Sequence, residues 1–253
     1  MRQGQDVTAW QAVGIVLVGD AQVETSGVVV RGVEGAGIVQ DSSTAIHTNI
    51  VVSDNQGEGI RLQGTGTPPT LDIQTGTLDA NGLAGILARD AGSITLGTVT
   101  VSNTVAVPVA TVLGAVDVGD GLQLLSPLGP VALSDVAFTD NGRAGILLDA
   151  DTDGATYSVA RVSVRSQQPE AYGVVVQNGA APGSLDEVDV ETNLADRDAA
   201  LDTPLGVVEP RVVPSAASLG EAGFVGEEGF VGEEGFVGEE GFVGEEGFVG
   251  GAD

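Results

Sequence analysis

The segment LDADTDGA carries alternating carboxylates before a glycine, at Asp149, Asp151, Asp153 and Gly154. Three carboxylates at alternate positions on a turn, followed by a glycine for the bend, open a calcium-binding loop. A full loop of the EF-hand type needs a bidentate glutamate at its twelfth position, where this chain has Ala160. Two alternatives follow. One is a partial calcium site completed by a neighbouring segment, with Asp90 of ARDAG as the candidate ligand, and the other is an ordinary solvated acidic loop.

Calcium is the one cofactor that the sequence suggests, and no motif requires a cofactor. The chain has no cysteine and a single histidine, His47 in TAIHTN, so it offers neither a thiolate nucleophile nor an imidazole cluster. It also has no G-x-S-x-G segment, which would place a nucleophilic serine on a sharp turn. We therefore expect His47 to be packed or solvated rather than catalytic.

The charge balance excludes two classes of partner. The 253 residues include 9 Arg, no Lys and 36 Asp and Glu, which gives a formal net charge of −27. Binding to nucleic acid or to an anionic membrane depends on clustered cations, so neither is expected. The longest apolar run, AVGIVLVG at 12–19, is far shorter than the roughly 20 residues that span a bilayer. We expect no nucleic-acid binding and no membrane insertion.

An internal repeat specifies the elements that position these side chains. Short runs with alternating β-branched residues end in one polar slot, which holds Val33, Asn55, Asn81, Asn103, Asn141, Gln167 and Asn193. Four residues after the slot, a glycine begins GIVQ, GIRL, GILA and GILL, at Gly37, Gly59, Gly85 and Gly145. The unit is a strand, a polar corner, a glycine, a second strand and a variable loop, in about 22–26 residues.

A repeat of this length with several short strands predicts a solenoid whose coils stack in parallel register. Hairpins would need tight two-residue turns, and helices do not fit the period of two. In such a stack the slot amides of successive coils lie about 4.8 Å apart and can bond along the axis. We therefore predict a structural ladder made by Asn55, Asn81, Asn103, Asn141 and Asn193.

The units NQGEGIRL at 55–62, NGLAGILA at 81–88 and NGRAGILL at 141–148 resemble coils of the right-handed parallel β-helix proteins of the pectin-lyase-like superfamily. The resemblance covers about residues 7–193 and implies an all-β, single-stranded, right-handed parallel β-helix of about seven coils. This superfamily includes polysaccharide lyases, hydrolases, epimerases, adhesins and surface proteins without known chemistry. The fold alone does not choose among these functions.

The motifs of two enzyme groups in this superfamily are missing from the sequence. The N-T-D, D-D, G-H-G and R-I-K motifs of polygalacturonase-like hydrolases do not occur, nor does the R-x-P-x-x-R pattern of pectate lyases. The resemblance therefore implies a non-catalytic structural or interaction module of a surface or secreted protein, located outside the cell or on its surface. The alternative is a carbohydrate-active enzyme of the lyase or hydrolase kind, with its site on one face of the solenoid.

Composition divides the chain into three parts. Residues 1–195 form the predicted β-helix domain, 196–222 a Pro-containing linker, and 223–253 an acidic tail in which GFVGEE recurs. Residues 219–253 carry 10 acids, no base and five of the six Phe. Near-identical six-residue units indicate a low-complexity array, which we expect to be disordered and to offer periodic Phe contacts.

One coil departs from the repeat, because 18 residues separate Asn103 from the next marker, Gly121. The excess is VAVPVATVLGAVDV at 105–118, which we expect to be a loop excursion. An apolar loop is a candidate contact surface for a polysaccharide or protein partner, and the alternative is that it folds over an edge of its own coil.

The first coil has no amphipathic helix to cover its open edge. Solenoids need polar capping units at their ends. We therefore expect self-association through an uncapped end, or a chain that is a fragment of a longer solenoid.

Overall fold

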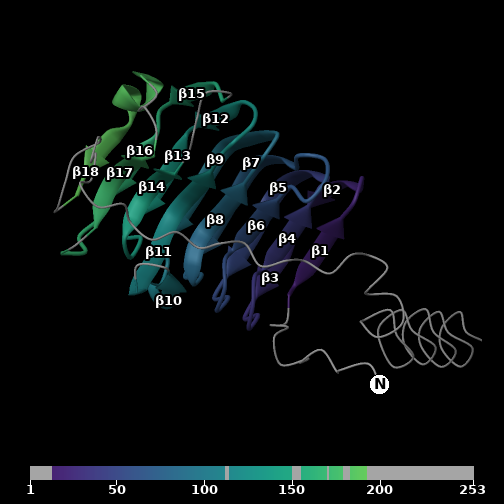
Figure 1. The fold of residues 1–253 in the computed structure, drawn as a ribbon, viewed down its shortest axis with the longest axis horizontal. Helices are drawn as coiled ribbons and strands as arrows, with labels where there is room; N and C mark the ends of the chain where they lie inside the picture. The colour runs from purple at the N-terminus through teal and green to yellow at the C-terminus, as the bar shows by residue number, and fades with distance from the viewer. Residues whose placement is uncertain (1–12, 112–113, 150–154, 170, 179–182, 193–253) are drawn as a thin grey trace, which may run out of the picture. The chain divides into compact units, whose positions relative to one another are not determined.

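The computed structural model describes residues 13–111, 114–149, 155–169, 171–178 and 183–192 (Figure 1). Within these ranges the regular structure is β-strand, apart from one short 3-10 helix, η2 (Gly183–Glu187). The strands form two sheets of almost entirely parallel pairs, which confirms the predicted all-β parallel β-solenoid. No helix in the described part of the chain is long and apolar enough to cross a membrane.

Sheet A receives one strand from each coil. Its strands, in stacking order, are β1 (Ile15–Val18), β4 (Ile38–Asp41), β6 (Ile60–Gln63), β8 (Leu83–Arg89), β11 (Gly114–Leu125), β14 (Ala144–Asp149) and β17 (Tyr172–Gln177). Ile38 pairs with Ile60 and Ile60 with Ile86, so the repeated G-I-x-L motif marks the entry of the chain into this sheet. About six turns of the chain separate the first of these strands from the last, close to the seven coils expected.

Sheet B closes the other side of each coil and bends at its middle. Its strands are β2 (Gln22–Ser26), β3 (Val29–Arg31), β5 (Thr44–Ser53), β7 (Thr70–Asp79), β9 (Ser93–Ser102), β12 (Val131–Ser134), β13 (Val136–Thr139), β15 (Tyr157–Ala160), β16 (Ser163–Arg165) and β18 (Asp189–Glu191). β2 pairs with the first half of β5 and β3 with the second half, so the sheet has a first and a second limb. Asn49, Asp135 and Arg161 lie at the bend with φ values of 56°, 58° and 54°.

The interior of the solenoid is filled by aliphatic side chains that stack from coil to coil. The inward rows of sheet A and of both limbs of sheet B form one buried cluster, in which Phe138 is the largest fully buried side chain. The repeated glycines are needed where strands approach closely. A Cβ on Gly145 would lie 2.3 Å from Cγ1 of Val164, so the corner admits no side chain there.

The two sheets differ in how their outer faces are covered. Strands of sheet B alternate between buried and more exposed residues, as a sheet with one solvated face does. β4 and β6 are instead buried at every position, and β14 and β17 at all but one. From β4 to β17 sheet A is therefore buried on both faces, and the residues of β1 are half-buried.

Within residues 105–118, the described parts form two antiparallel strands rather than the expected loop. β10 (Val107–Thr111) pairs antiparallel with the first part of β11, Val107 opposite Val118 and Thr111 opposite Gly114. Figure 1 shows this ribbon at the lower end of β11, which lies inside the strand order of sheet A. The alternating valines of VAVPVATV satisfy the period of a strand, and this is why the excursion pairs with itself.

Several predictions from the sequence fall outside the described residues. These are the linker at 196–222, the tail at 223–253, and the residues Asp151, Asp153 and Asn193. Their predicted roles stay predictions.

Candidate functional site

A polar corner joins the second limb of sheet B to sheet A in every central coil. The corner residue has a left-handed backbone at Asp54, Ala80, Asn103 and Asp140, with φ between 51° and 56°. Asp and Asn adopt this conformation more readily than most residues because their short side chains bond locally. The buried slot is the residue that follows, and it holds Asn55, Asn81, Thr104 and Asn141.

The structure thus places Asn103 one residue before the slot, in contrast to the register assumed from the sequence. Its side chain is exposed, and its Nδ2 donates to Oδ1 of Asp79 at 2.8 Å. Thr104 occupies the slot and donates from Oγ1 to Oδ1 of Asn141 at 2.6 Å. The buried row therefore mixes amides with one hydroxyl.

The first two amides of the predicted ladder are in direct contact. Asn55 donates from Nδ2 to Oδ1 of Asn81 at 2.7 Å, and Asn81 donates from Nδ2 to the carbonyl of Val52 at 2.9 Å. Oδ1 of Asn55 accepts the backbone N–H of Val33 at 3.0 Å. Each amide thus satisfies backbone groups at the corner and ties its coil to the next.

A line of exposed and half-buried polar side chains runs beside this corner, along the outer face of the second limb of sheet B. We call it the polar row, and register places in it Arg31, Ser53, Asp79, Ser102, Thr139, Arg165 and Glu191. These side chains point outward because the adjacent residues, such as Val52, Val101 and Phe138, are buried in the interior. The row presents hydroxyl, carboxylate and guanidinium groups at intervals of about 4.8 Å.

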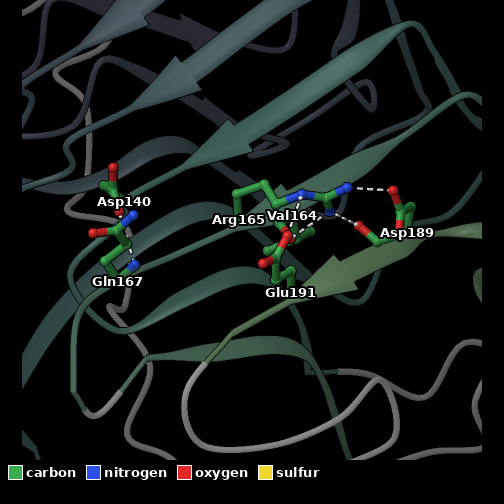
Figure 2. Close-up of polar contacts among 6 residues, drawn as sticks. All are labelled: Asp140, Val164, Arg165, Gln167, Asp189 and Glu191. Carbon is green, nitrogen blue, oxygen red and sulfur yellow. Dashed lines mark hydrogen bonds and ion pairs between the residues drawn. The ribbon is translucent and has the colours of Figure 1, made fainter.

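Hydrogen bonds along the polar row link neighbouring coils. Asp79 accepts from Oγ of Ser102 at 2.6 Å, in addition to its bond from Asn103. Figure 2 shows the last part of the row, where Arg165 of β16 reaches β18. Its Nη1 donates to the carbonyl of Asp189 at 2.7 Å, its Nη2 pairs with the Asp189 carboxylate, and its Nε lies 3.2 Å from Oε2 of Glu191. Oδ1 of Asp140 accepts the backbone N–H of Gln167 at 2.9 Å in the same view.

The candidate calcium ligands are only partly described. Asp149 is the last residue of β14, and its Oδ1 accepts from Nδ2 of Asn178 at 2.6 Å. Asp90 has a left-handed backbone and lies 3.6 Å from Nε of Arg89. Among the described residues no three carboxylate or imidazole groups converge on a metal-sized site. With Asp151 and Asp153 outside those residues, the calcium hypothesis stays a prediction.

His47 lies inside the solenoid, near its first coil. Its Nδ1 is 2.7 Å from Oγ1 of Thr25, and Nε2 is buried without a hydrogen-bond partner. Burial lowers the pKa of His47, and the nearby carboxylate of Asp72 opposes that shift only in part. A neutral, enclosed imidazole fits a packed residue better than a catalytic base.

Two buried ion pairs on sheet A were not anticipated from the sequence. Arg61 donates from Nη2 to Oε2 of Glu58 at 2.6 Å, and Arg143 donates from Nε to Oδ1 of Asp120 at 2.8 Å. Burial raises the pKa of Asp120, and the Arg143 guanidinium works against that shift. The available signal was the charged residue within an otherwise apolar strand, in EGIRL and GDGLQL.

The hairpin presents an apolar surface of its own. Val105 is 52% exposed, and Ala106 and Pro108 are exposed beside it. On the other side of the ribbon, Val109 and Val116 pack against Ala84, Leu87, Val118 and Leu125. The hairpin therefore packs with one side against sheet A and exposes an apolar edge to solvent.

Comparisons with known proteins give no relative on which to base a function. No family model, curated protein or solved structure matches the chain.

Proposed function

We propose that this chain is a non-catalytic interaction module of a surface or secreted protein, of the kind found among pectin-lyase-like β-helices, and that it binds an extended polysaccharide. The polar row carries this proposal. It offers hydrogen-bonding groups in a straight line along the stack, at about one group per 4.8 Å over about six steps. A long polymer rich in hydroxyl groups matches a regular line of donors and acceptors better than a compact ligand does.

The acidic groups of the row favour neutral sugars over anionic ones. Asp79 and Glu191 belong to the row, and Asp54 and Asp140 lie at the adjoining corner. Carboxylates bond well to sugar hydroxyls but repel uronic acids and phosphates. With a net charge of −27, we likewise expect no binding to nucleic acid.

We propose that the hairpin at 105–118 supplies a second contact surface, for a polysaccharide or for a protein partner. The support is its projection from the solenoid and the open apolar edge at Val105 and Pro108. Apolar residues rimmed by polar ones are typical of contact surfaces. This surface and the polar row are independent and can be tested separately.

Binding to a panel of neutral and acidic polysaccharides, measured by calorimetry, tests the proposal. Thr139→Val removes a hydroxyl group from the row, and Asp79→Asn replaces a charged acceptor with a neutral amide, so we expect about five- to tenfold weaker binding for each. Thr95→Val, at an exposed position on the first limb, is the matched control and should bind like the parent chain. If all three variants bind as tightly as the parent chain, the polar row is not the binding surface.

The same panel separates binding from catalysis. A carbohydrate-active enzyme would release reducing or unsaturated ends from one of these polymers, and its active carboxylates would lie about 5–10 Å apart. In the proposed module the polymer is recovered intact after prolonged incubation. Products that disappear with Asp79→Asn would establish the enzyme instead.

We also propose that copies of the chain associate through the first coil. Among the described residues β1, β2 and β3 are each paired on one side only, and Val29 is 53% exposed. Unpaired strand edges bond readily to other strands. Light scattering should therefore show oligomers that grow with concentration, and a monomer at all concentrations would contradict this.

A further inference from the structure

The outward side chains of sheet A are buried as completely as the inward ones. Arg61, Leu87, Gln123, Leu147 and Val175 follow one another in register across five strands. Leu87, Gln123, Leu147 and Val175 are each 0% exposed, and Arg61 is 7% exposed. A sheet face that met solvent would expose at least part of such a row.

The direction of these side chains follows from their neighbours. Ile146 and Leu148 belong to the interior cluster, and Leu147 between them packs instead with Ala144, Val175 and Tyr172. Successive side chains of a strand point to opposite faces, so Leu147 points away from the interior. The same alternation sets Leu87 apart from Ile86 and Ala88.

No described element lies over most of this face. The described elements packed against β14 are its neighbours in the sheet, β11 and β17, and the strands β13 and β16 across the interior. The hairpin contacts Ala84 and Leu87, near its own coil. The described elements therefore do not account for the burial of the row from Leu147 to Val175, and the parts of the chain outside the described ranges are the candidates to cover it.

Length restricts which part that is. Sheet A is about 29 Å across its seven strands. The internal gaps in the described ranges have at most five residues, which span about 17 Å and are held at both ends. Residues 1–12 join the stack at β1, the strand of sheet A farthest from Val175. The 15 residues 196–210 span up to about 50 Å when extended, enough to cross the whole sheet.

The composition of 196–210 suits an apolar sheet face. Leu201, Leu205, Val207 and Val208 are spread along it, and Pro204 and Pro210 favour an extended backbone. The last described strand, β18, ends at Glu191 in the coil that follows β17, so this segment begins at one end of the stack.

We propose that residues 196–210, expected from the sequence to be a plain linker, dock across the outer face of sheet A. Leu201, early in the segment, is its large apolar residue nearest along the chain to the row at Leu147 and Val175, and Leu205 follows it across the sheet. Because the segment covers the outer face of sheet A, we expect polymers and protein partners to bind at sheet B and at the hairpin. The inference does not depend on what those surfaces bind.

Thiol labelling of the full chain tests this docking, because the natural sequence has no cysteine. Leu147→Cys places a thiol on the covered face, and Thr100→Cys places one on the exposed outer face of sheet B. We expect the first to react with a maleimide at least about tenfold more slowly than the second. Val175→Cys is the second reporter, for use if Leu147→Cys does not give a folded chain by circular dichroism.

Disrupting the segment identifies the occupant. Leu201→Asp with Leu205→Asp should raise the labelling rate of the Leu147→Cys thiol toward that of the Thr100→Cys thiol. Phe230→Asp with Val231→Asp makes the same chemical change in the tail and should leave the rate unchanged. Protection that survives Leu201→Asp with Leu205→Asp, or equal labelling of the two thiols in the otherwise unchanged chain, overturns the proposal.

Discussion

Arg143 forms a bidentate ion pair with Asp120 of the adjacent coil, with Nε 2.8 Å from Oδ1 and Nη2 donating to Oδ2. Both side chains are almost fully buried, so the pair is isolated from solvent. The strand register shows which residues other coils have at the positions of Asp120 and Arg143. Asp120 lies opposite Ala84 and Ala144, and Leu83 precedes Ala84 as Arg143 precedes Ala144.

Removing one partner of this ion pair should be costly, whereas removing both should not. Asp120→Ala leaves a buried guanidinium without its carboxylate, and we expect a loss of about 3–5 kcal/mol in the free energy of unfolding. Asp120→Ala with Arg143→Leu copies the adjacent coil and should recover most of that loss. Urea denaturation measures both. A double variant as unstable as Asp120→Ala would contradict this view of the pair.

The slot residues should respond to substitution more strongly than the corner residue beside them. Asn81→Leu removes the acceptor of Asn55 and the donor to the Val52 carbonyl, at a cost of about 1–3 kcal/mol. Thr104→Val should also destabilise the chain, because Oδ1 of Asn141 loses a bond.

Asn103→Gly is the matched control for these slot variants. It keeps the left-handed corner and removes only an exposed hydrogen bond, so a change within about 0.5 kcal/mol is expected. A large loss of stability in Asn103→Gly, together with no change in Thr104→Val, would indicate that Asn103 and not Thr104 is the slot residue.

The repeated glycine should not tolerate even one methyl group. Gly145→Ala would place its Cβ 2.3 Å from Val164 Cγ1 and 3.0 Å from the carbonyl of Gly173, and overpacking of this kind costs about 1–3 kcal/mol. Gly66→Ala meets nothing closer than 3.4 Å and should be nearly neutral in the same thermal melts. Val164→Ala added to Gly145→Ala should restore part of the stability.

Stability should fall in mild acid because of His47. Its pKa is lowered in the folded state by burial, whereas the unfolded value is about 6.5. The unfolded chain therefore binds more protons as pH falls below about 6.5, and stability decreases from there down to the folded pKa. His47→Gln keeps a partner for Thr25 and cannot titrate. Between pH 7.5 and 5 the parent chain should lose more thermal stability than this variant, and parallel curves would exclude His47 as the cause.

Millimolar calcium should raise the melting temperature if Asp149, Asp151 and Asp153 bind it, because a ligand of the folded state stabilises that state. Asp151→Asn with Asp153→Asn should abolish the rise and leave the melting temperature without calcium nearly unchanged. A melting temperature that calcium does not alter in the parent chain would identify an ordinary acidic loop.

The repeat predicted the fold because the spacing of Gly59, Gly85 and Gly145 reflects the geometry of one coil, which every coil must satisfy. The register predicted at Asn103 was wrong by one residue, because VTVSNT places Asn and Thr side by side. Both a left-handed corner and a buried slot accept Asn, and only the packing of Thr104 against Asn141 decides between them. The segment 105–118 was recognised as an excursion, but it occurs in one coil only, so no repeat indicates that β10 pairs with β11.

The buried pairs on sheet A and the covering of that face could not be read from the repeat. Arg61 and Asp120 stand at positions that other coils fill with Leu87 and Ala84, so their burial depends on something outside the coil. A period in the sequence reports contacts between neighbouring coils. The period does not indicate contacts made by a segment that crosses many coils.

Parallel strand pairing in this fold joins residues that are 22 to 37 positions apart, as Ile38 with Ile60 and Val99 with Val136 show. Each coil can therefore form on its predecessor without waiting for distant chain segments, and a partly folded stack is a natural intermediate. A segment laid across all seven strands of sheet A would add contacts between residues more than a hundred positions apart. Its docking would come last in folding and would make separately forming coils melt as a single cooperative unit.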